Sequence, residues 1–201
     1  IETASLPRHH DLAKDILDYA QKGRFDAIVV GRRGLTKLQS AILGSTSSNL
    51  LHHSAVLPIW VIDGEGTSER ILVAVDGSEG SLRAVDHLSF IFAGSRRVRL
   101  DLFHVIPRLS ETCAIDLQGA RSKLDKIGER GARHCIDHFH ERAMERFGQA
   151  GIHASQVQIT LTPRMRSPGP GIIDQARKGG YGTVVIGRRG LSPSLFTGSV
   201  S

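Results

Sequence analysis

The chain has 201 residues, of which 40% are hydrophobic, an ordinary fraction for a globular protein with one or two real cores. The net charge of +6 favours anionic ligands, but only 5% of residues are aromatic and no nucleic-acid-binding motif occurs, so DNA and RNA are not expected as partners. Cys113 and Cys135 are too few for a disulfide framework, and without a signal-peptide pattern or a long apolar run we expect a cytoplasmic protein and no membrane partner.

The first part of the chain predicts two helices and two strands. Apolar residues recur on one stripe of a helix from His10 to Lys22, and a shorter helix is predicted from Thr46 to His53. Residues 26–30 form a short β-branched run, which is typical of a buried parallel strand, and 57–62 predict another strand.

A glycine motif follows the first predicted strand. Gly31 and Gly34 bracket two arginines, and nine residues later come Gly44, Ser45 and Thr46. Glycine lets the backbone approach an anion closely, and the free N–H groups of a helix opened by Gly44 suit a phosphate. The motif therefore predicts a phosphate-binding turn, with a plain strand-to-helix turn as the alternative. It is not a Walker-type P-loop, because no Gly-Lys-Ser/Thr follows a glycine loop.

The rest of the chain alternates strands with helices. A polar, glycine-bearing linker is predicted at 64–69. Strands are predicted at 71–75, 98–105, 155–161 and 183–186, and helices at 79–92, 119–148 and 169–178. This alternation predicts right-handed βαβ units and a parallel sheet covered by helices on both faces.

The glycine motif nearly recurs 156 positions later, which indicates two copies of one unit. Gly187 and Gly190 again follow a strand-like run, but only seven residues separate Gly190 from Gly198 and Ser199. We expect residues 1–63 to be the C-terminal half of a first domain and 70–201 to be a second domain that lacks its last strand. The period is far longer than that of solenoid repeats, so it indicates duplicated domains.

Asp76 ends the first predicted strand of the second unit. In a doubly wound sheet, ligands bind outside the carboxyl ends of the strands, where the strand order reverses. Asp76 and Gly187 would then face one crevice, with the carboxylate near an adenosine and the glycines near its phosphates. The alternative makes Asp76 a turn former and Ser78 a helix cap. Mg²⁺ held between Asp76 and nucleotide phosphates would fit the first interpretation.

Ten histidines raise the hypothesis of a metal site. His134, His138 and Glu141 fall on one face of a predicted helix, but one helix comfortably supplies only two ligands and no partner pair is evident. We interpret this face as solvated and expect no protein-bound metal. The serines lack a nucleophile elbow, so no catalytic residues are expected either.

These patterns resemble the universal stress protein family in its tandem form. The resemblance rests on the Gly-x2-Gly-x9-Gly-Ser/Thr spacing, on Val-Ala-Val-Asp-Gly-Ser at 73–78 and on Leu-Pro-Ile-Trp-Val at 57–61. It implies an α/β, Rossmann-like fold of the adenine nucleotide alpha hydrolase type, with a doubly wound parallel five-stranded sheet of order 3-2-1-4-5. It also implies pairing of the two units or a homodimer, and in one branch ATP or AMP binding.

The resemblance also implies which residues contact the nucleotide. In the second unit these are Asp76 beside the nucleoside, the Val105 backbone at adenine, and Gly187, Gly190, Gly198 and Ser199 at phosphate and ribose; in the first unit they are Gly31, Gly34, Gly44, Ser45 and Thr46. The first unit has the family spacing without the aspartate strand, and the second has that strand with a shorter loop.

We therefore expect an adenine-nucleotide-binding stress-response regulator or sensor rather than a dedicated enzyme, with at most slow ATP hydrolysis. The alternatives are a dimerisation scaffold of the same fold that binds no nucleotide, and an adenylating ligase-type enzyme that shares the sheet.

Overall fold

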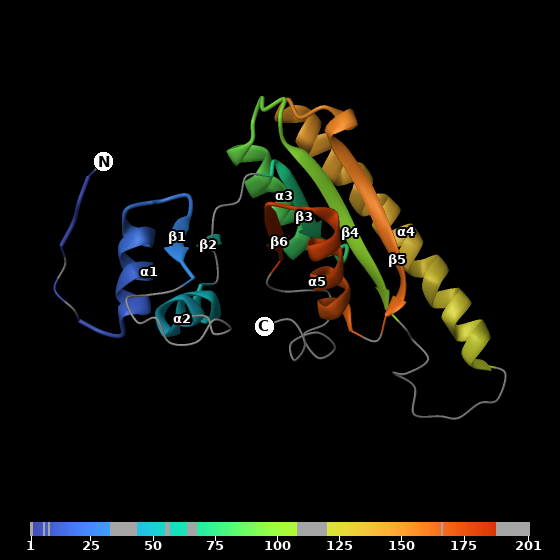
Figure 1. Ribbon diagram of the computed structural model, residues 1–201, viewed down its shortest axis with the longest axis horizontal. Coiled ribbons are helices and arrows are strands. Elements are labelled where there is room, and N and C mark those ends of the chain that lie inside the picture. Colours follow the sequence, from blue (N-terminus) through green and yellow to red (C-terminus); the bar gives the residue numbers. More distant parts are fainter. Residues whose placement is uncertain are drawn as a thin grey trace. The chain divides into compact units, whose positions relative to one another are not determined.

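The chain divides into two compact units, Ile1–Gly66 and Thr67–Ser201 (Figure 1). The computed structural model describes residues 2–5, 7, 9–32, 44–54, 57–63, 68–107, 120–165 and 167–187. The unit boundary falls inside the predicted linker. That each unit is an incomplete domain stays a prediction.

The described residues of the first unit form two helices and a two-stranded parallel sheet. Its elements in chain order are α1 (Leu12–Lys22), β1 (Ile28–Gly31), α2 (Ser45–His53) and β2 (Ile59–Ile62). Strands β1 and β2 pair so that Ile28 lies opposite Ile59. The core consists of Ala13, Leu17, Ala20, Ile28 and Leu50. The apolar stripe of α1 therefore packs on one face of the sheet, as its periodicity predicts.

The described residues of the second unit form a four-stranded parallel sheet. Its strands are β3 (Arg70–Ala74), β4 (Arg99–Pro107), β5 (Val157–Met165) and β6 (Thr183–Ile186), in the order β5-β4-β3-β6. Numbered within the unit, this order is 3-2-1-4, which agrees with the first four positions of the predicted order. A fifth strand in this sheet lies outside what the described residues show.

Helices cover both faces of this sheet, as predicted. They are α3 (Glu79–Ile91), α4 (Ala120–Gln149) and α5 (Pro168–Gly179). Residues of α3 and α4 such as Val85 and Phe147 pack against Leu102 of β4, whereas Ile172 of α5 packs with Leu72 and Phe103 on the other face. No described helix, including the 30-residue α4, is apolar enough to cross a bilayer.

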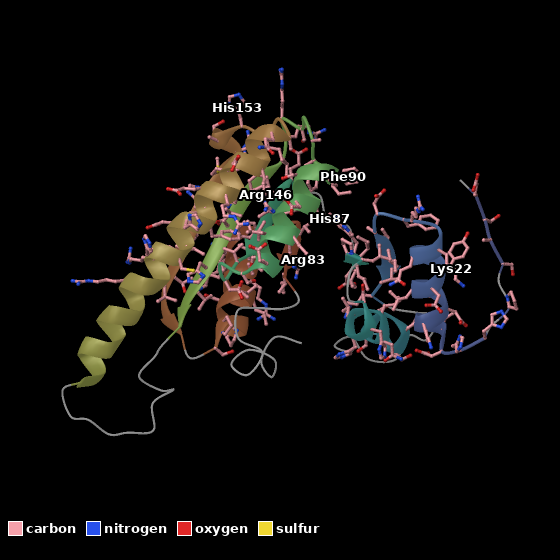
Figure 2. The ribbon with its side chains drawn as sticks, turned by 180° about the vertical axis from the view of Figure 1, so that it is seen from behind. Lys22, Arg83, His87, Phe90, Arg146 and His153 are labelled. Atoms are coloured by element: carbon pink, nitrogen blue, oxygen red, sulfur yellow. The ribbon has the colours of Figure 1, made fainter. Side chains whose placement is uncertain are left out.

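Two ion pairs join α3 to α4 along their outer surface. Arg146 Nη1 lies 2.5 Å from Asp86 Oδ2, and Arg142 Nη1 lies 2.9 Å from Glu79 Oε1. Figure 2 shows Arg146 beside α3. Since these pairs are partly exposed, they contribute little to stability and mainly orient the two helices.

The start of β5 was predicted wrongly. Residues Ala154–Gln156 form a short 3-10 helix, and the strand begins only at Val157. Gln156 determines this, because its Oε1 accepts a hydrogen bond from the His153 N–H (3.0 Å) and its Nε2 donates to the carbonyls of Ser95 and Val98 (both 2.9 Å). Ser95 and Val98 lie far away in the sequence, so the local pattern carries no sign of these two partners.

Candidate functional site

The turn after β3 places Asp76 at the carboxyl end of the second sheet. Asp76 Oδ1 accepts hydrogen bonds from the Ser78 N–H (3.0 Å) and from Ser81 Oγ (2.7 Å). Ser78 caps α3, since its side chain accepts a hydrogen bond from the Ser81 N–H (3.2 Å). The turn-former interpretation of Asp76 and the cap interpretation of Ser78 therefore both describe the structure. Both hydrogen bonds to the carboxylate use Oδ1 and hold it beside the N-terminus of α3.

Gly77 is required in this turn. Its φ is +82°, a conformation that side-chain-bearing residues rarely adopt. A Cβ atom at this position would also lie 3.3 Å from Sγ of Cys135 on α4. The turn that carries Asp76 is therefore packed closely beneath α4.

Gly187 lies against the first turn of α3. A Cβ atom there would come within 3.0–3.1 Å of backbone atoms of Gly80 and Ser81. Because Ser81 also donates to Asp76, the structure brings Asp76 and Gly187 to the same helix terminus. Gly190, Gly198 and Ser199, the other predicted phosphate contacts of this unit, lie outside the described residues.

Val105 and His104 form the corresponding end of β4. Val105 is half-buried and packs in the small core on the α5 face. His104 is buried, and its Nδ1 lies 2.8 Å from the Val75 carbonyl oxygen. Because a carbonyl only accepts, Nδ1 carries the hydrogen. Nε2 is then an acceptor, and it is buried with no hydrogen-bond partner among the described residues.

Burial lowers the pKa of the His104 imidazole, and the Val75 carbonyl and the negative charge of Asp76 oppose this effect. The ring is therefore neutral at neutral pH. Its single strong hydrogen bond joins the ends of β3 and β4, next to the two predicted contacts Asp76 and Val105. Sequence reasoning missed His104, since one histidine inside an apolar strand gives no sign of its partner.

The first unit brings its own glycine motif to the N-terminus of α2. Gly44 is the N-cap residue, and its N–H donates to the Arg32 carbonyl (3.1 Å). Ser47 Oγ donates to the Gly31 carbonyl (3.0 Å), so the end of β1 is held against the first helical turn. Gly31, Gly44, Ser45 and Thr46 thus lie together, whereas Gly34 lies outside the described residues. The first N–H groups of an α-helix have no intrahelical acceptor, which suits an anion.

One arginine of this motif has a structural role. Arg32 Nε lies 2.6 Å from Asp63 Oδ2, and the Arg32 N–H donates to the Ile62 carbonyl (2.9 Å). These contacts join the ends of β1 and β2. The sequence signal that could have shown this is an arginine directly after one strand and an aspartate directly after its parallel neighbour.

The histidine-rich face of α4 is exposed. His138 Nδ1 lies 3.7 Å from Glu141 Oε2, and the two side chains are 70% and 79% exposed. Within the described ranges, no three His, Cys, Asp or Glu side chains are grouped closely enough to hold a metal. The solvated-face interpretation agrees with this exposure.

The sequence model of the "Universal stress protein family" matches residues 4–63 and 67–201 of this chain. A universal stress protein of Mycolicibacterium smegmatis is 33% identical over 103 residues, which are 49% of this chain and 34% of that protein. The chain thus spans about a third of that relative's length.

Solved structures of the same family are also similar to this chain. A universal stress protein from Archaeoglobus fulgidus has a TM-score of 0.53 at 20% identity, over 91% of this chain and 56% of its own. Universal stress protein UspA from Lactobacillus plantarum has a TM-score of 0.49 at 21% identity, over 65% and 83%. At such identity the Archaeoglobus structure shows the fold alone, an α/β Rossmann-like architecture with parallel strands. Because the family model matches nearly the whole sequence, the chain belongs to the universal stress protein family.

Proposed function

We propose that this protein binds ATP or AMP at the carboxyl end of the second sheet and acts as a stress-response regulator or sensor. One observation carries the proposal: Asp76 and Gly187 both lie against Ser81 at the N-terminus of α3. A carboxylate and a glycine turn at one helix terminus suit the two ends of a nucleotide.

Each group has a distinct role in this proposal. Asp76 accepts hydrogen bonds from the nucleoside, and the Val105 backbone contacts adenine. Gly187 contacts a phosphate through its backbone, and its lack of a side chain lets it lie against the first turn of α3. Gly190, Gly198 and Ser199 complete the phosphate contacts. The carboxylate of Asp76 is also the kind of oxygen ligand that Mg²⁺ prefers, and the bound ion would neutralise phosphate charge.

The first unit supports a second, partial candidate site. Gly44, Ser45 and Thr46 open α2 beside Gly31, and this geometry suits a phosphate. The described part of this unit has no strand that corresponds to β3 and the Asp76 turn after it, so a nucleoside would lack that wall. We therefore favour the second unit.

A universal stress protein has been solved in complex with cAMP, at 22% identity to this chain and a TM-score of 0.39. That ligand belongs to that protein. The proposal for this chain instead rests on its family and on the arrangement of Asp76 and Gly187. A tandem form, pairing of the two units or a homodimer, and a cytoplasmic location are further parts of the proposal.

Calorimetric titration with ATP and AMP tests the proposal. Asp76→Asn keeps an acceptor for Ser78 and Ser81 while removing the charge, so the turn should survive and the affinity should fall about tenfold. Asp137→Asn, an exposed carboxylate on α4, is the matched control and should bind like the wild type. Gly190→Val should abolish binding by filling the phosphate approach.

The titration, a thermal-shift measurement and a pyrophosphate-release assay separate the alternatives. No heat and no thermal shift at millimolar nucleotide would refute binding and favour the scaffold. Pyrophosphate release with a candidate acceptor would instead favour the ligase. Unchanged affinity in both the Asp76 and Gly190 variants would move the site to the first unit.

A further inference from the structure

Strand β4 lies between β3 and β5, and its pairing with each neighbour ends at a different point (Figure 1). Pairing with β3 ends where Ala74 lies opposite Phe103. Pairing with β5 continues to Val105, which lies opposite Thr162, and an irregularity in register follows between Val105 and Pro107. The last part of β4 therefore has β5 on one side and, among the described residues, no strand on the other.

Val105 directs its backbone N–H and C=O to this open side. The Phe103 carbonyl accepts a hydrogen bond from the Val75 N–H (2.9 Å), so the peptide groups of Phe103 face β3. Peptide groups along a strand alternate between its two neighbours, so those of Val105 face the same side as those of Phe103. A regular parallel ladder would next join the Val105 N–H to the Val75 carbonyl, but the pairing ends before this bond.

The side chain of His104 takes the place of that backbone donor. Its Nδ1 lies 2.8 Å from the Val75 carbonyl oxygen. This contact has a cost, because Nε2 is buried without a hydrogen-bond partner among the described residues. Leu102, two residues earlier on the same face of β4, is an ordinary core residue without such a cost. What the histidine adds at this position is therefore the Nδ1 donor.

Asp76 holds the other side of the opening. Its N–H donates to Ser81 Oγ (3.2 Å), and the same Oγ donates to Asp76 Oδ1 (2.7 Å). These two hydrogen bonds turn the chain after Val75 towards α3. Val75 is thus held twice, through its carbonyl to His104 and through Asp76 to Ser81. Together the contacts keep β3 from pairing with β4 beyond Ala74.

A free N–H beside a free C=O matches the edge of adenine. In an extended residue the two groups lie side by side, one a donor and the other an acceptor. Adenine presents its amino group, a donor, next to a ring nitrogen that accepts. Hypoxanthine carries a carbonyl in place of that amino group, so it would oppose the Val105 carbonyl with a second acceptor. Such a mismatch leaves polar groups unsatisfied, and a binding site discriminates strongly against it.

We propose that His104 is a positioning residue for adenine recognition, because by occupying the Val75 carbonyl it keeps the Val105 N–H and C=O free for the base. This inference rests on the proposed nucleotide site and adds the side chain that keeps it open. His104 acts through Val75 and Val105 rather than by touching the nucleotide. Without the imidazole donor, the Val105 N–H pairs with Val75 and extends the β3–β4 ladder by one bond.

Calorimetric titrations of the full chain with ATP and with ITP, whose base is hypoxanthine, test this role. The wild type should bind ATP at least about tenfold more tightly than ITP. His104→Leu removes the donor, so it should weaken ATP binding about tenfold, leave ITP binding nearly unchanged and abolish the preference. His104→Asn keeps a donor for Val75 and should retain the preference.

The ratio of the two affinities separates positioning from folding. A side chain that only supports the fold would change ATP and ITP binding by the same factor. His134→Leu, at an exposed position of α4, is the matched control and should bind both nucleotides like the wild type. Circular dichroism of each variant checks the fold.

NMR of the nucleotide-free protein tests the same contact without a ligand. Scalar coupling across a hydrogen bond between the Val105 N–H and the Val75 carbonyl carbon should be absent in the wild type and present in His104→Leu. That coupling in the wild type would overturn the inference without any variant, and so would a full ATP preference in a folded His104→Leu protein. A wild type that binds no ATP at millimolar concentration would instead refute the proposed function, and this inference with it.

Discussion

At the scale of single residues, His104 connects the ends of β3 and β4. Its Nδ1 hydrogen bond to the Val75 carbonyl fixes the backbone next to Asp76, and its own neighbour is Val105. The ring is buried and its Nε2 has no partner among the described residues, so a second proton would be costly there. The neutral imidazole is thus part of the folded state.

This burial predicts a loss of stability in acid. The pKa of His104 is lowered from 6.5 in the folded protein, so below pH 6.5 the unfolded chain binds a proton that the folded chain excludes. The stabilisation is complete above pH 6.5 and falls as the pH drops towards the folded pKa. Urea unfolding at pH 7 and pH 5 should show a smaller pH dependence in His104→Asn than in the wild type, because asparagine donates to Val75 without titrating. The same change at exposed His134 is the control, and equal pH dependence in wild type and His104→Asn would contradict the account.

Gly187 predicts a close approach that a methyl group would disturb. Gly187→Ala places a Cβ 3.0–3.1 Å from the backbone of α3, so we expect it to lower the free energy of unfolding by about 1–3 kcal/mol and to weaken ATP binding. Gly148→Ala is the matched control, because nothing lies within 4 Å of a Cβ there and alanine should be neutral or slightly stabilising. Chemical denaturation measures both. A Gly187→Ala protein as stable as the control would disprove the close approach.

The sequence allowed prediction of those candidate-site residues whose hydrogen-bond partners are close in the sequence. Asp76, Gly77 and Ser78 form their turn among themselves and with Ser81, so the pattern alone indicated both turn and cap. His104 was missed, because its partner Val75 lies at the end of another strand. Such contacts depend on how the strands align, which no local pattern encodes.

At the scale of elements, α3 depends on its cap. Ser78 is buried, and its Oγ accepts the Ser81 N–H at the start of the helix. The same turn carries Asp76 at its first position. Stability of α3 and geometry of the site are therefore coupled through three consecutive residues.

Ser78, the N-cap of α3, has a hydrogen-bonded hydroxyl, whereas Ser89 within the helix has a buried hydroxyl without a partner among the described residues. Ser78→Ala should cost about 1 kcal/mol through loss of the cap. Ser89→Ala should be neutral or stabilising, because the buried Ser89 hydroxyl has no hydrogen-bond partner among the described residues. Urea denaturation of both variants is the measurement, and an equal loss in the two would show that the cap contributes nothing.

The strands and helices themselves were largely predictable. The apolar stripe of α1 and the β-branched run of β6 identify their elements, and β6 has the predicted ends. The predicted ends of elements were wrong where side chains bind backbone groups. For example, α1 begins at Leu12 rather than His10, because the N–H groups of His9 and His10 both donate to Asp15 Oδ2.

At the scale of the whole molecule, the strand order came from the resemblance to a family rather than from periodicity. Alternating strands and helices predict a parallel sheet, but many strand orders are compatible with this alternation. The observed β5-β4-β3-β6 order matters for function, because it places β3 beside both β4 and β6 and so brings Asp76 near Val105 and Gly187. The glycine loops after Arg32 and after Gly187 lie outside the described residues, so the shorter second loop stays a sequence observation.

The proposed function requires that adenine nucleotide binds the second unit at the end of β3. Amide NMR of the full chain during ATP titration tests it most directly, because it locates the ligand residue by residue. We predict saturable shifts largest at Asp76, Ser81, Val105 and Gly187, with little change at Gly44, Ser45 and Thr46. Shifts confined to these first-unit residues, or no saturable shifts at millimolar ATP, would contradict the claim.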